Sequence, residues 1–526
     1  MGSSQILLFA LIAIKIKTQA PGAHTFPEII LAHHGRANHL TYLFFGWATN
    51  LLVGSCLVLG GSQVVGALSG VNVYGACFLI PLVVAAYVIA GGLRSTFIAD
   101  YAHTVILFIA IFTFGFSMYA TSPTVGSIDK FYDMLLEAGK TMPIAGNAHG
   151  GSYLTFKSND GLVFAIDLLV AGFCTVWLDQ AYWQRAIASR PETSVKAYLF
   201  GGMAWYGIPF GFATIAGLGC AALTASPSFP TFPNPLSAAQ NGSGLSAPAM
   251  AIALLGSGGA GLLLLLLFMA VTSSTSAELI AVSSLITFDV YKTYIKPSAT
   301  SDQLVRMSHI GIIIFSVVLA SFCCILNAVG INLTWVLTIL GVIVGAKWGA
   351  VEAERSVVAQ TRLHKILYGV SAKQSPSSAE AAIANADMEK GVPNAPSPVA
   401  RDTEKQPPSD PAPESIVPTG NAIVDFLEAS YSKPMDPAAA RKATKLAYGF
   451  NVAYWAIALL LVPFTFFGTE WEFTRAGFTG WCVMSFMWVW FSACVCIFWP
   501  LWESRETMKS IIMGIFGDTG GRSAAS

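Results

Sequence analysis

The sequence predicts an all-α, polytopic membrane protein. Of its 526 residues, 54% are hydrophobic and only 11% are charged, against about 25% charged residues in typical soluble domains. Mean hydropathy is +0.61, and apolar segments long enough to cross a bilayer recur along the chain. Lys plus Arg and Asp plus Glu number 29 each, so net charge indicates neither nucleic acid nor an acidic partner, and membrane lipid is the expected surrounding.

The sequence motifs do not predict an enzyme. The chain contains no P-loop, no HExxH, no GxSxG and no zinc-ligand spacing. Its nine cysteines form no CxxC pair and lie mostly in apolar runs, which favours small buried hydrophobes over metal or redox chemistry. We therefore expect no catalytic residue, no cofactor and no metal beyond a transported ion.

The predicted membrane segments follow one another from the N-terminus. Residues 5–18 are apolar but too short to cross a core of about 30 Å, so they resemble a membrane helix whose beginning is missing. Residues 19–40 predict a polar loop that carries His33, His34 and His39. The pair of histidines suits a solvated polar cluster, and the alternative is a pH sensor or a metal ligand. Longer segments are each predicted to span the membrane: 41–67, 73–92, 97–120, 161–183, 197–223, 260–292, 303–328, 446–467 and 477–501.

The composition changes abruptly near residue 345. Residues 333–345 begin another apolar crossing, but a polar stretch follows, and residues 370–418 are rich in Pro, Ser, Ala and Glu, which is typical of disorder. The predicted organisation has three parts. They are membrane-core helices at 1–345, a cytoplasmic and largely disordered segment at 346–440, and two membrane helices with a cytoplasmic tail at 441–526.

The segment 260–292 carries a row of hydroxyl residues in the middle of an apolar helix. At helical spacing Ala270, Ser273 and Ser274 share one face, which is small and bears oxygens. Such a face suits either close helix packing or a desolvated cation, and the residues alone leave both open. Glu278 follows directly, and an ionisable group inside an apolar run is a functional candidate.

A carboxylate among aromatic rings marks the end of the segment 161–183. Trp177, Tyr182 and Trp183 bracket Asp179. Rings for the faces and oxygens for the N–H groups suit a small, planar, neutral, hydrogen-bonding solute. The alternative is a belt of aromatic residues at the membrane interface.

Asp100 lies one turn into a helix that follows the pair Gly91 and Gly92. Arg94 places this junction on the cytoplasmic side by the positive-inside rule. A carboxylate there suits an arriving or leaving cation, and the alternative is a carboxylate that complements the helix dipole.

Several segments together resemble the sodium:solute symporter family. GGLRSTFIADYAH resembles the junction of its core helices four and five, DQAYWQRAIASRP the segment after core helix six, and AVTSSTSAELIAVSSLITFDVYK core helix eight. HTFPEIILAHHGRANHLTYLFFG and SAELIAVSSLITFDVYKTYI resemble more closely the branch of fungal urea active transporters, which are urea/cation symporters. The resemblance covers most of the chain outside 346–415.

The resemblance implies a leucine-transporter-like fold, in which two inverted repeats carry broken helices at the bilayer midplane. It also implies an incomplete version of that fold. The chain starts within what resembles core helix two, so the first core helix is absent, and core helix ten is cut short near residue 345. The expected function is secondary active import of urea across the plasma membrane, coupled to H⁺ or Na⁺. An alternative is a non-transporting remnant or membrane sensor that signals through 346–440.

The resemblance also implies roles for the candidate residues. Ala270, Ser273 and Ser274 fall on the family's sodium-site positions. Asp100 falls on an aspartate near the inner exit, so Asp100 and Glu278 become candidates for the ion pathway or for proton coupling.

Core helix six, here about 161–183, carries substrate contacts in the family. Thr175, Trp177 and Asp179 are therefore the implied urea contacts. Polyamines are the alternative substrate, for which Asp179 and Glu278 would be counter-charges.

Overall fold

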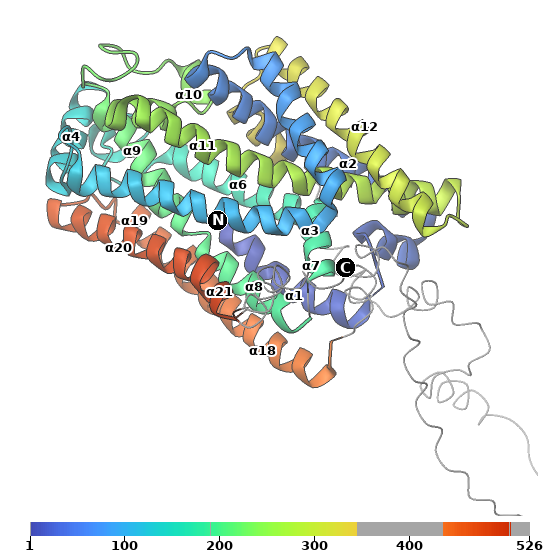
Figure 1. Cartoon of the computed structure of the whole chain (residues 1–526). Coiled ribbons are helices and arrows are strands. Elements are labelled where there is room, and N and C mark those ends of the chain that lie inside the picture. Colours follow the sequence, from blue (N-terminus) through green and yellow to red (C-terminus); the bar gives the residue numbers. More distant parts are fainter. Residues whose placement is uncertain (1, 21, 190, 345–434, 504, 506–526) are drawn as a thin grey trace, which may run out of the picture.

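The computed structural model describes residues 2–20, 22–189, 191–344, 435–503 and 505. The described part of the chain is a bundle of helices (Figure 1), so the predicted helical class is confirmed. Nine of its helices are long and apolar enough to cross a membrane, and each overlaps one of the nine longer predicted segments. Two of them, Phe26–Ser69 and Ser246–Ile295, begin well before the predicted starts at 41 and 260. The predictions for 346–434 and for the tail from 506 lie outside the described residues.

The first half of the chain forms the elements α1 to α9. In order they are α1 (Gly2–Gln19), α2 (Phe26–Ser69), α3 (Val73–Phe116), η1 (Ser117–Thr121), α4 (Ile128–Thr141), α5 (Ala148–Gly151), α6 (Asn159–Leu178), α7 (Gln180–Ala188), α8 (Pro191–Ala204), η2 (Gly207–Ala213) and α9 (Thr214–Leu223).

The second half forms the remaining elements, up to α21. In order they are α10 (Ala238–Gly242), α11 (Ser246–Ser284), η3 (Leu285–Ile295), α12 (Ser301–Ala328), α13 (Leu333–Val344), α18 (Pro437–Tyr454), η4 (Trp455–Leu461), α19 (Val462–Gly468), α20 (Arg475–Ala493), η5 (Cys494–Phe498) and α21 (Trp499–Glu503). In both halves the elements labelled η are π-helices.

Three long helices are broken at glycines with positive φ. In α2 the break lies at Gly35 (φ 76°). Gly92 (φ 56°) separates the two spans Val73–Gly92 and Thr96–Thr121 within α3, as the Gly-Gly pair predicts. Gly256 (φ 60°) divides α11 into a short first part and a long second part. A side chain would disfavour these backbone angles, so glycine is the residue that permits each break.

The predicted polar loop at 19–40 is wrong over most of its length, because α2 begins at Phe26. Thr25 is the N-cap and accepts a hydrogen bond from the Glu28 backbone N–H, and a proline follows in the first turn. His34 is exposed, in agreement with a solvated cluster, but His39 is completely buried. Polar composition therefore marks here a helix that faces water on one side rather than a loop.

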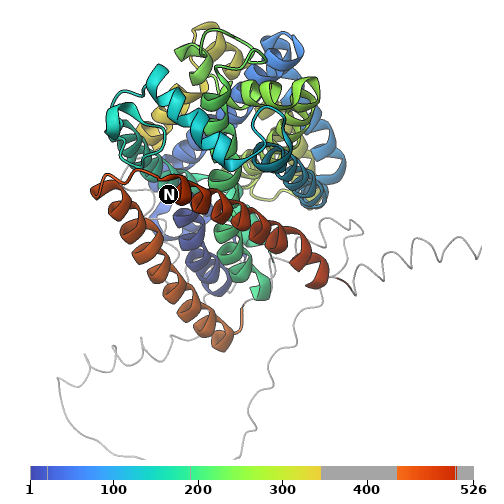
Figure 2. The same cartoon turned by 90° about the vertical axis from the view of Figure 1, so that its left-hand side faces the viewer.

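The helices α2, α3, α11 and α12 pack together as one group. In Figure 1, α11 and α3 run side by side over much of their length. The orange and red helices α18 to α21 lie along one side of the bundle in both views (Figure 2). There α18 packs against α1, and α20 packs against η2 and α8.

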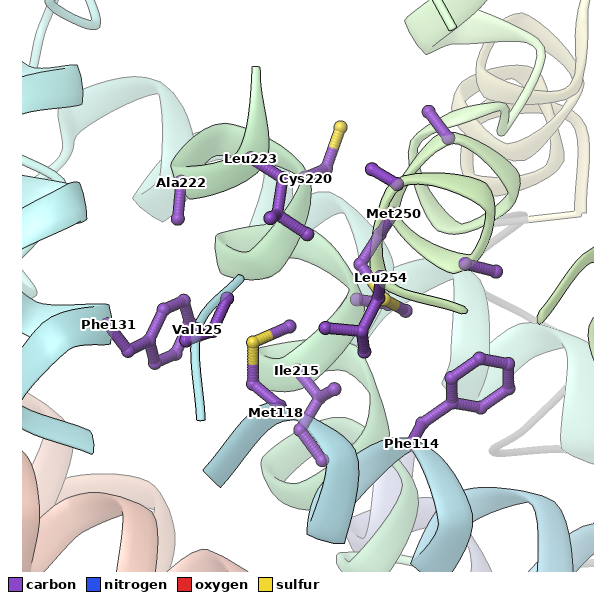
Figure 3. Packing of buried hydrophobic residues seen from close by; sticks show 14 of the residues in the cluster. Phe114, Met118, Val125, Phe131, Ile215, Cys220, Ala222, Leu223, Met250 and Leu254 are labelled. Carbon is purple, nitrogen blue, oxygen red and sulfur yellow. The ribbon is translucent and has the colours of Figure 1, made fainter. Parts of the chain in front are cut away.

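A buried apolar cluster fixes the first part of α11 against α3 and α9. Phe114 and Met118 from α3 and η1 meet Ile215 of α9 and Met250 and Leu254 of α11 (Figure 3). Each of these side chains is at most 6% exposed. Lipid competes for the same apolar contacts, so close packing rather than the hydrophobic effect holds such helices together.

Candidate functional site

Asp179 lies at a break between two helices inside the bundle. It ends α6 and begins α7, and its own backbone is extended (φ −86°, ψ 112°). Its Oδ1 accepts a hydrogen bond of 2.7 Å from the Ala181 backbone N–H, which caps α7. The capping bond and the positive end of the helix dipole both favour a carboxylate at this position.

Asn50 of α2 joins Asp179 to Glu278 of α11. Its Nδ2 donates one hydrogen bond to Asp179 Oδ1 and one to Glu278 Oε2, each of 2.7 Å. Asn50, Asp179 and Glu278 are 0%, 1% and 4% exposed. We call these three residues the Asn50 cluster. It connects three elements that are far apart in the sequence and places two carboxyl groups against a single amide nitrogen.

Asp100 of α3 forms a second carboxylate site with a different environment. Its Oδ2 accepts a hydrogen bond of 2.8 Å from Arg185 Nη2 of α7, and its Oδ1 accepts one from the Ser273 hydroxyl of α11. The side chains of Asp100 and Arg185 are 17% and 38% exposed. We call this the Asp100 pair, in which the fold itself supplies the counter-charge.

The three predicted sodium-site residues lie on α11 but differ in exposure and in hydrogen bonding. Ser273 is half-buried and bonded to Asp100, Ala270 is half-buried, and Ser274 is exposed. Two neighbouring hydroxyls are occupied by their own helix, since Thr272 donates to the Phe268 carbonyl and Ser276 to the Ser273 carbonyl, each at 2.7 Å. The sodium site at Ala270, Ser273 and Ser274 therefore stays a prediction of the family resemblance.

Of the three predicted urea contacts, Asp179 is the one that joins the Asn50 cluster. The Thr175 hydroxyl donates to the Ala171 carbonyl at 2.8 Å, within its own helix. Trp177 is 7% exposed and its ring contacts Phe9 of α1. Its indole N–H is buried and has no hydrogen-bond partner within the described ranges. An unpartnered buried donor is unusual in a folded protein and is compatible with a ligand contact.

The sequence alone does not predict two residues of these sites, Asn50 and Arg185. Asn50 lies within a predicted span, where a side-chain amide in the middle of an apolar run is a signal for interhelical hydrogen bonding. Arg185 follows the segment 161–183, where a basic residue predicts the cytoplasmic side, whereas in the structure it binds Asp100.

A third buried polar contact joins α2 to η3. The imidazole of His39 lies 2.9 Å from Asp289 Oδ1 through Nε2 and 2.6 Å from the Tyr294 hydroxyl through Nδ1. His39 and Asp289 are both completely buried. Asp289 thus has a titratable partner of its own within the protein.

An apolar cavity of about 470 Å³ lies elsewhere, between α8, η2, α18 and α20. Its lining includes Tyr206, Phe210, Tyr454 and Trp488 and none of the predicted site residues. This cavity is therefore distinct from the Asn50 cluster and from the Asp100 pair.

Helices that break around buried polar side chains within a membrane bundle are the architecture of secondary transporters. The model of the family described as "Sodium:solute symporter family" matches residues 2–351, and the chain belongs to this family.

Its curated relatives carry more specific names. The chain is 33% identical to the "Urea active transporter" of Saccharomyces cerevisiae, over 98% of this chain and 81% of the relative. It is 34% identical to the "Probable urea active transporter 3" of Schizosaccharomyces pombe, over 96% and 79%. It is 43% identical to the "Urea-proton symporter DUR3" of Oryza sativa subsp. japonica, over 65% and 48%.

Two further comparisons concern the fold. A solved structure of a Na⁺-coupled sialic acid symporter in a substrate-bound outward-open state matches with a TM-score of 0.50 at 15% identity. It covers 67% of this chain and 83% of that chain, and it confirms the predicted leucine-transporter-like class. The alignment with the S. cerevisiae relative spans 602 positions, more than the 526 residues of this chain. That relative therefore has internal segments without a counterpart here.

Proposed function

We propose that this protein imports urea across the plasma membrane as a secondary active transporter coupled to H⁺ or Na⁺. The observation that carries the proposal is the identity of 33–35% with three yeast proteins named as urea active transporters or probable ones, over 96–98% of the chain. Membership of a symporter family supports transport driven by a cation gradient.

The chemistry of the Asn50 cluster supports a solute such as urea. Urea offers four N–H hydrogens and one carbonyl oxygen, so its recognition needs mainly acceptors. Asp179 and Glu278 supply carboxyl oxygens, and Asn50 Oδ1 is a buried acceptor that has no partner among the described residues. Buried polar groups that lack partners discriminate strongly in favour of a solute that satisfies them.

The transport assay uses labelled urea in cells that lack their own urea transport. We expect concentrative uptake by this chain. A second version, which restores the internal segments of the S. cerevisiae relative, is measured in parallel. Uptake by either version supports urea as the substrate, and restriction to the restored version assigns those segments an essential part. Absence of uptake by both overturns the proposal.

Competition distinguishes urea from the alternative substrate. Excess spermidine is expected to leave the uptake of labelled urea unchanged. Strong inhibition by spermidine would instead make Asp179 and Glu278 counter-charges for a polyamine.

The predicted sodium site has its own test. If Na⁺ binds at Ala270, Ser273 and Ser274, then Ser273→Ala lowers the apparent affinity for Na⁺ in urea uptake, because one oxygen ligand is lost. An unchanged ion dependence assigns the hydroxyl row to helix packing and to the hydrogen bond with Asp100.

A further inference from the structure

We propose that Asp179 and Glu278 share one exchangeable proton beneath the amide of Asn50, and that this proton is the coupling ion. The inference rests on the proposed urea symport and identifies its driving ion. Its basis is the geometry of the Asn50 cluster, in which two buried carboxyl oxygens lie 2.7 Å from the same nitrogen atom.

The first argument is the balance of donors and acceptors. The donors in the cluster are the Nδ2 group of Asn50 and the backbone N–H of Ala181. The acceptors are two carboxyl groups and Asn50 Oδ1, which is buried and has no hydrogen-bond partner in the part of the chain that the structure describes. A buried acceptor without a partner is costly. A proton on either carboxyl converts one acceptor into a donor, so the cluster lacks what one proton supplies.

The second argument is charge. Two carboxylates that contact one nitrogen are close neighbours, and burial removes the water that would screen their repulsion. Such a pair holds one proton in common over a wide range of pH and titrates as a unit.

No fixed positive charge replaces that proton among the described residues. The ionisable side chains that act electrostatically on the pair are Cys56 of α2 and Tyr182 and Arg185 of α7. Cysteine and tyrosine carry no positive charge in either protonation state. Arg185 is already bonded to Asp100 at 2.8 Å. The positive charge that neutralises the pair therefore has to come from solution.

The donor position favours a proton over a metal cation. The two N–H hydrogens of Asn50 point at the two carboxyl oxygens. A Na⁺ ion shared by those oxygens would meet the amide hydrogens, whereas hard cations require oxygen ligands. A proton needs one lone pair and fits beside the amide.

The location of the pair suits coupling to a change of conformation. Asp179 caps α7 at the break after α6, Asn50 belongs to α2, and Glu278 belongs to α11. With the proton bound, the three elements hold together through uncharged or singly charged contacts. Without it, two carboxylates repel one another across their junction. The bound proton therefore stabilises the state in which α2, α7 and α11 are packed together more than a state in which they are apart. Such a difference in stability between two conformations is what coupling requires.

The deciding experiment separates exchange from accumulation in proteoliposomes that contain the full chain. Counterflow of labelled urea against unlabelled urea needs no net proton movement, whereas accumulation driven by an imposed proton gradient does. Glu278→Gln keeps the shape and an acceptor oxygen but cannot ionise. Because Glu278 also belongs to the proposed urea site, we expect Glu278→Gln to lower counterflow to some extent, but to lower gradient-driven accumulation about tenfold more than counterflow, since the shared proton has no titrating partner.

A matched control for Glu278→Gln is available in η3, which continues α11. Asp289 of η3 is also completely buried, but its partner His39 lies 2.9 Å away within the protein. Asp289→Asn is expected to keep both counterflow and proton-driven accumulation. A second variant, Asp179→Asn, keeps an oxygen that can cap α7 and is expected to behave as Glu278→Gln does. Size-exclusion profiles identify the variants that fold.

The outcomes are distinguishable from failure of the proposed function. Absence of urea counterflow by the unaltered protein rejects urea transport itself. Counterflow together with accumulation driven by Na⁺ and not by protons overturns the proton inference alone. Proton-driven accumulation that persists in the folded variants Glu278→Gln and Asp179→Asn overturns it as well.

Discussion

Two carboxylate sites lie against α11, and their charge is balanced in different ways. Asp100 contacts a guanidinium at 2.8 Å, and both partners keep part of their surface exposed. Asp179 and Glu278 are almost completely buried, and the hydrogen-bond donors that they contact among the described residues are neutral, namely the Asn50 amide and the Ala181 backbone N–H. The charge of Asp100 is balanced by the Arg185 guanidinium, which the fold places beside it. A buried pair without such a cation must take its positive charge from solution, which is what an ion-coupled transporter requires.

The largest expected effect is the removal of the amide that bridges the buried pair. Asn50→Leu keeps a similar volume but leaves two buried carboxyl groups without their common donor. We expect a loss of about 3–5 kcal/mol of stability at neutral pH, the usual cost when one partner is stripped from buried charge. The loss should shrink as pH falls, because protonation removes the unpaired charge. Thermal unfolding in detergent across pH measures both.

Asn451→Leu is the control for this prediction. Asn451 is 4% exposed and donates to the backbone carbonyls of Leu7 and Ala447, at 3.0 and 2.9 Å. Its loss is expected to cost about 1–3 kcal/mol with no dependence on pH, since no carboxylate loses a donor. If the two variants lost the same stability with the same dependence on pH, Asn50 would not stabilise the protein by binding charged carboxylates.

A smaller effect is expected at the Asp100 pair. Arg185→Gln removes the cation but leaves a polar side chain that can still reach Asp100. Because both partners are partly exposed, we expect a loss of about 1 kcal/mol or less and retention of proton-driven urea uptake. Urea accumulation in proteoliposomes checks the second point. If Arg185→Gln abolished proton coupling, the coupling proton could not be assigned to the Asn50 cluster alone.

The smallest effect is expected at an exposed carboxylate far from both sites. Asp133 of α4 accepts hydrogen bonds from Arg475 at the start of α20, and these bonds hold the pKa of Asp133 below its ordinary value of 3.8. A lowered pKa in the folded state stabilises the protein above 3.8, and this contribution is lost as pH falls through the lowered pKa. Asp133→Asn should lower the thermal midpoint slightly at neutral pH and leave it unchanged in strong acid. A midpoint difference that grows in acid would reverse the sign of this linkage.

The sequence predicts the fold class and the spans well because both depend on local signals. Apolar length alone delimits the nine long segments, and the pair Gly91 and Gly92 marks the break within α3. The loop predicted at 19–40 fails for an equally local reason. Exposed polar residues occur on a water-facing helix as readily as in a loop, and the Thr25 cap decides between the two.

The site is only partly predictable because its contacts are not local. Asp179, Glu278 and Asp100 stand out as carboxylates in apolar runs, which single-sequence reasoning detects. Asn50 does not stand out, since its partners lie 129 and 228 residues away. Arg185 likewise lies 85 residues from Asp100, and its partner becomes visible only when α3 and α7 are packed together.

The most direct test of the account is the proton movement that accompanies urea entry. Urea is added outside lightly buffered proteoliposomes, and the external pH is recorded together with the uptake of labelled urea. We predict alkalinisation of the medium with about one proton per urea for the unaltered protein, and none for the reduced amount of urea that Glu278→Gln takes up. The same ratio of protons to urea in both proteins would contradict the assignment of the coupling proton to Asp179 and Glu278.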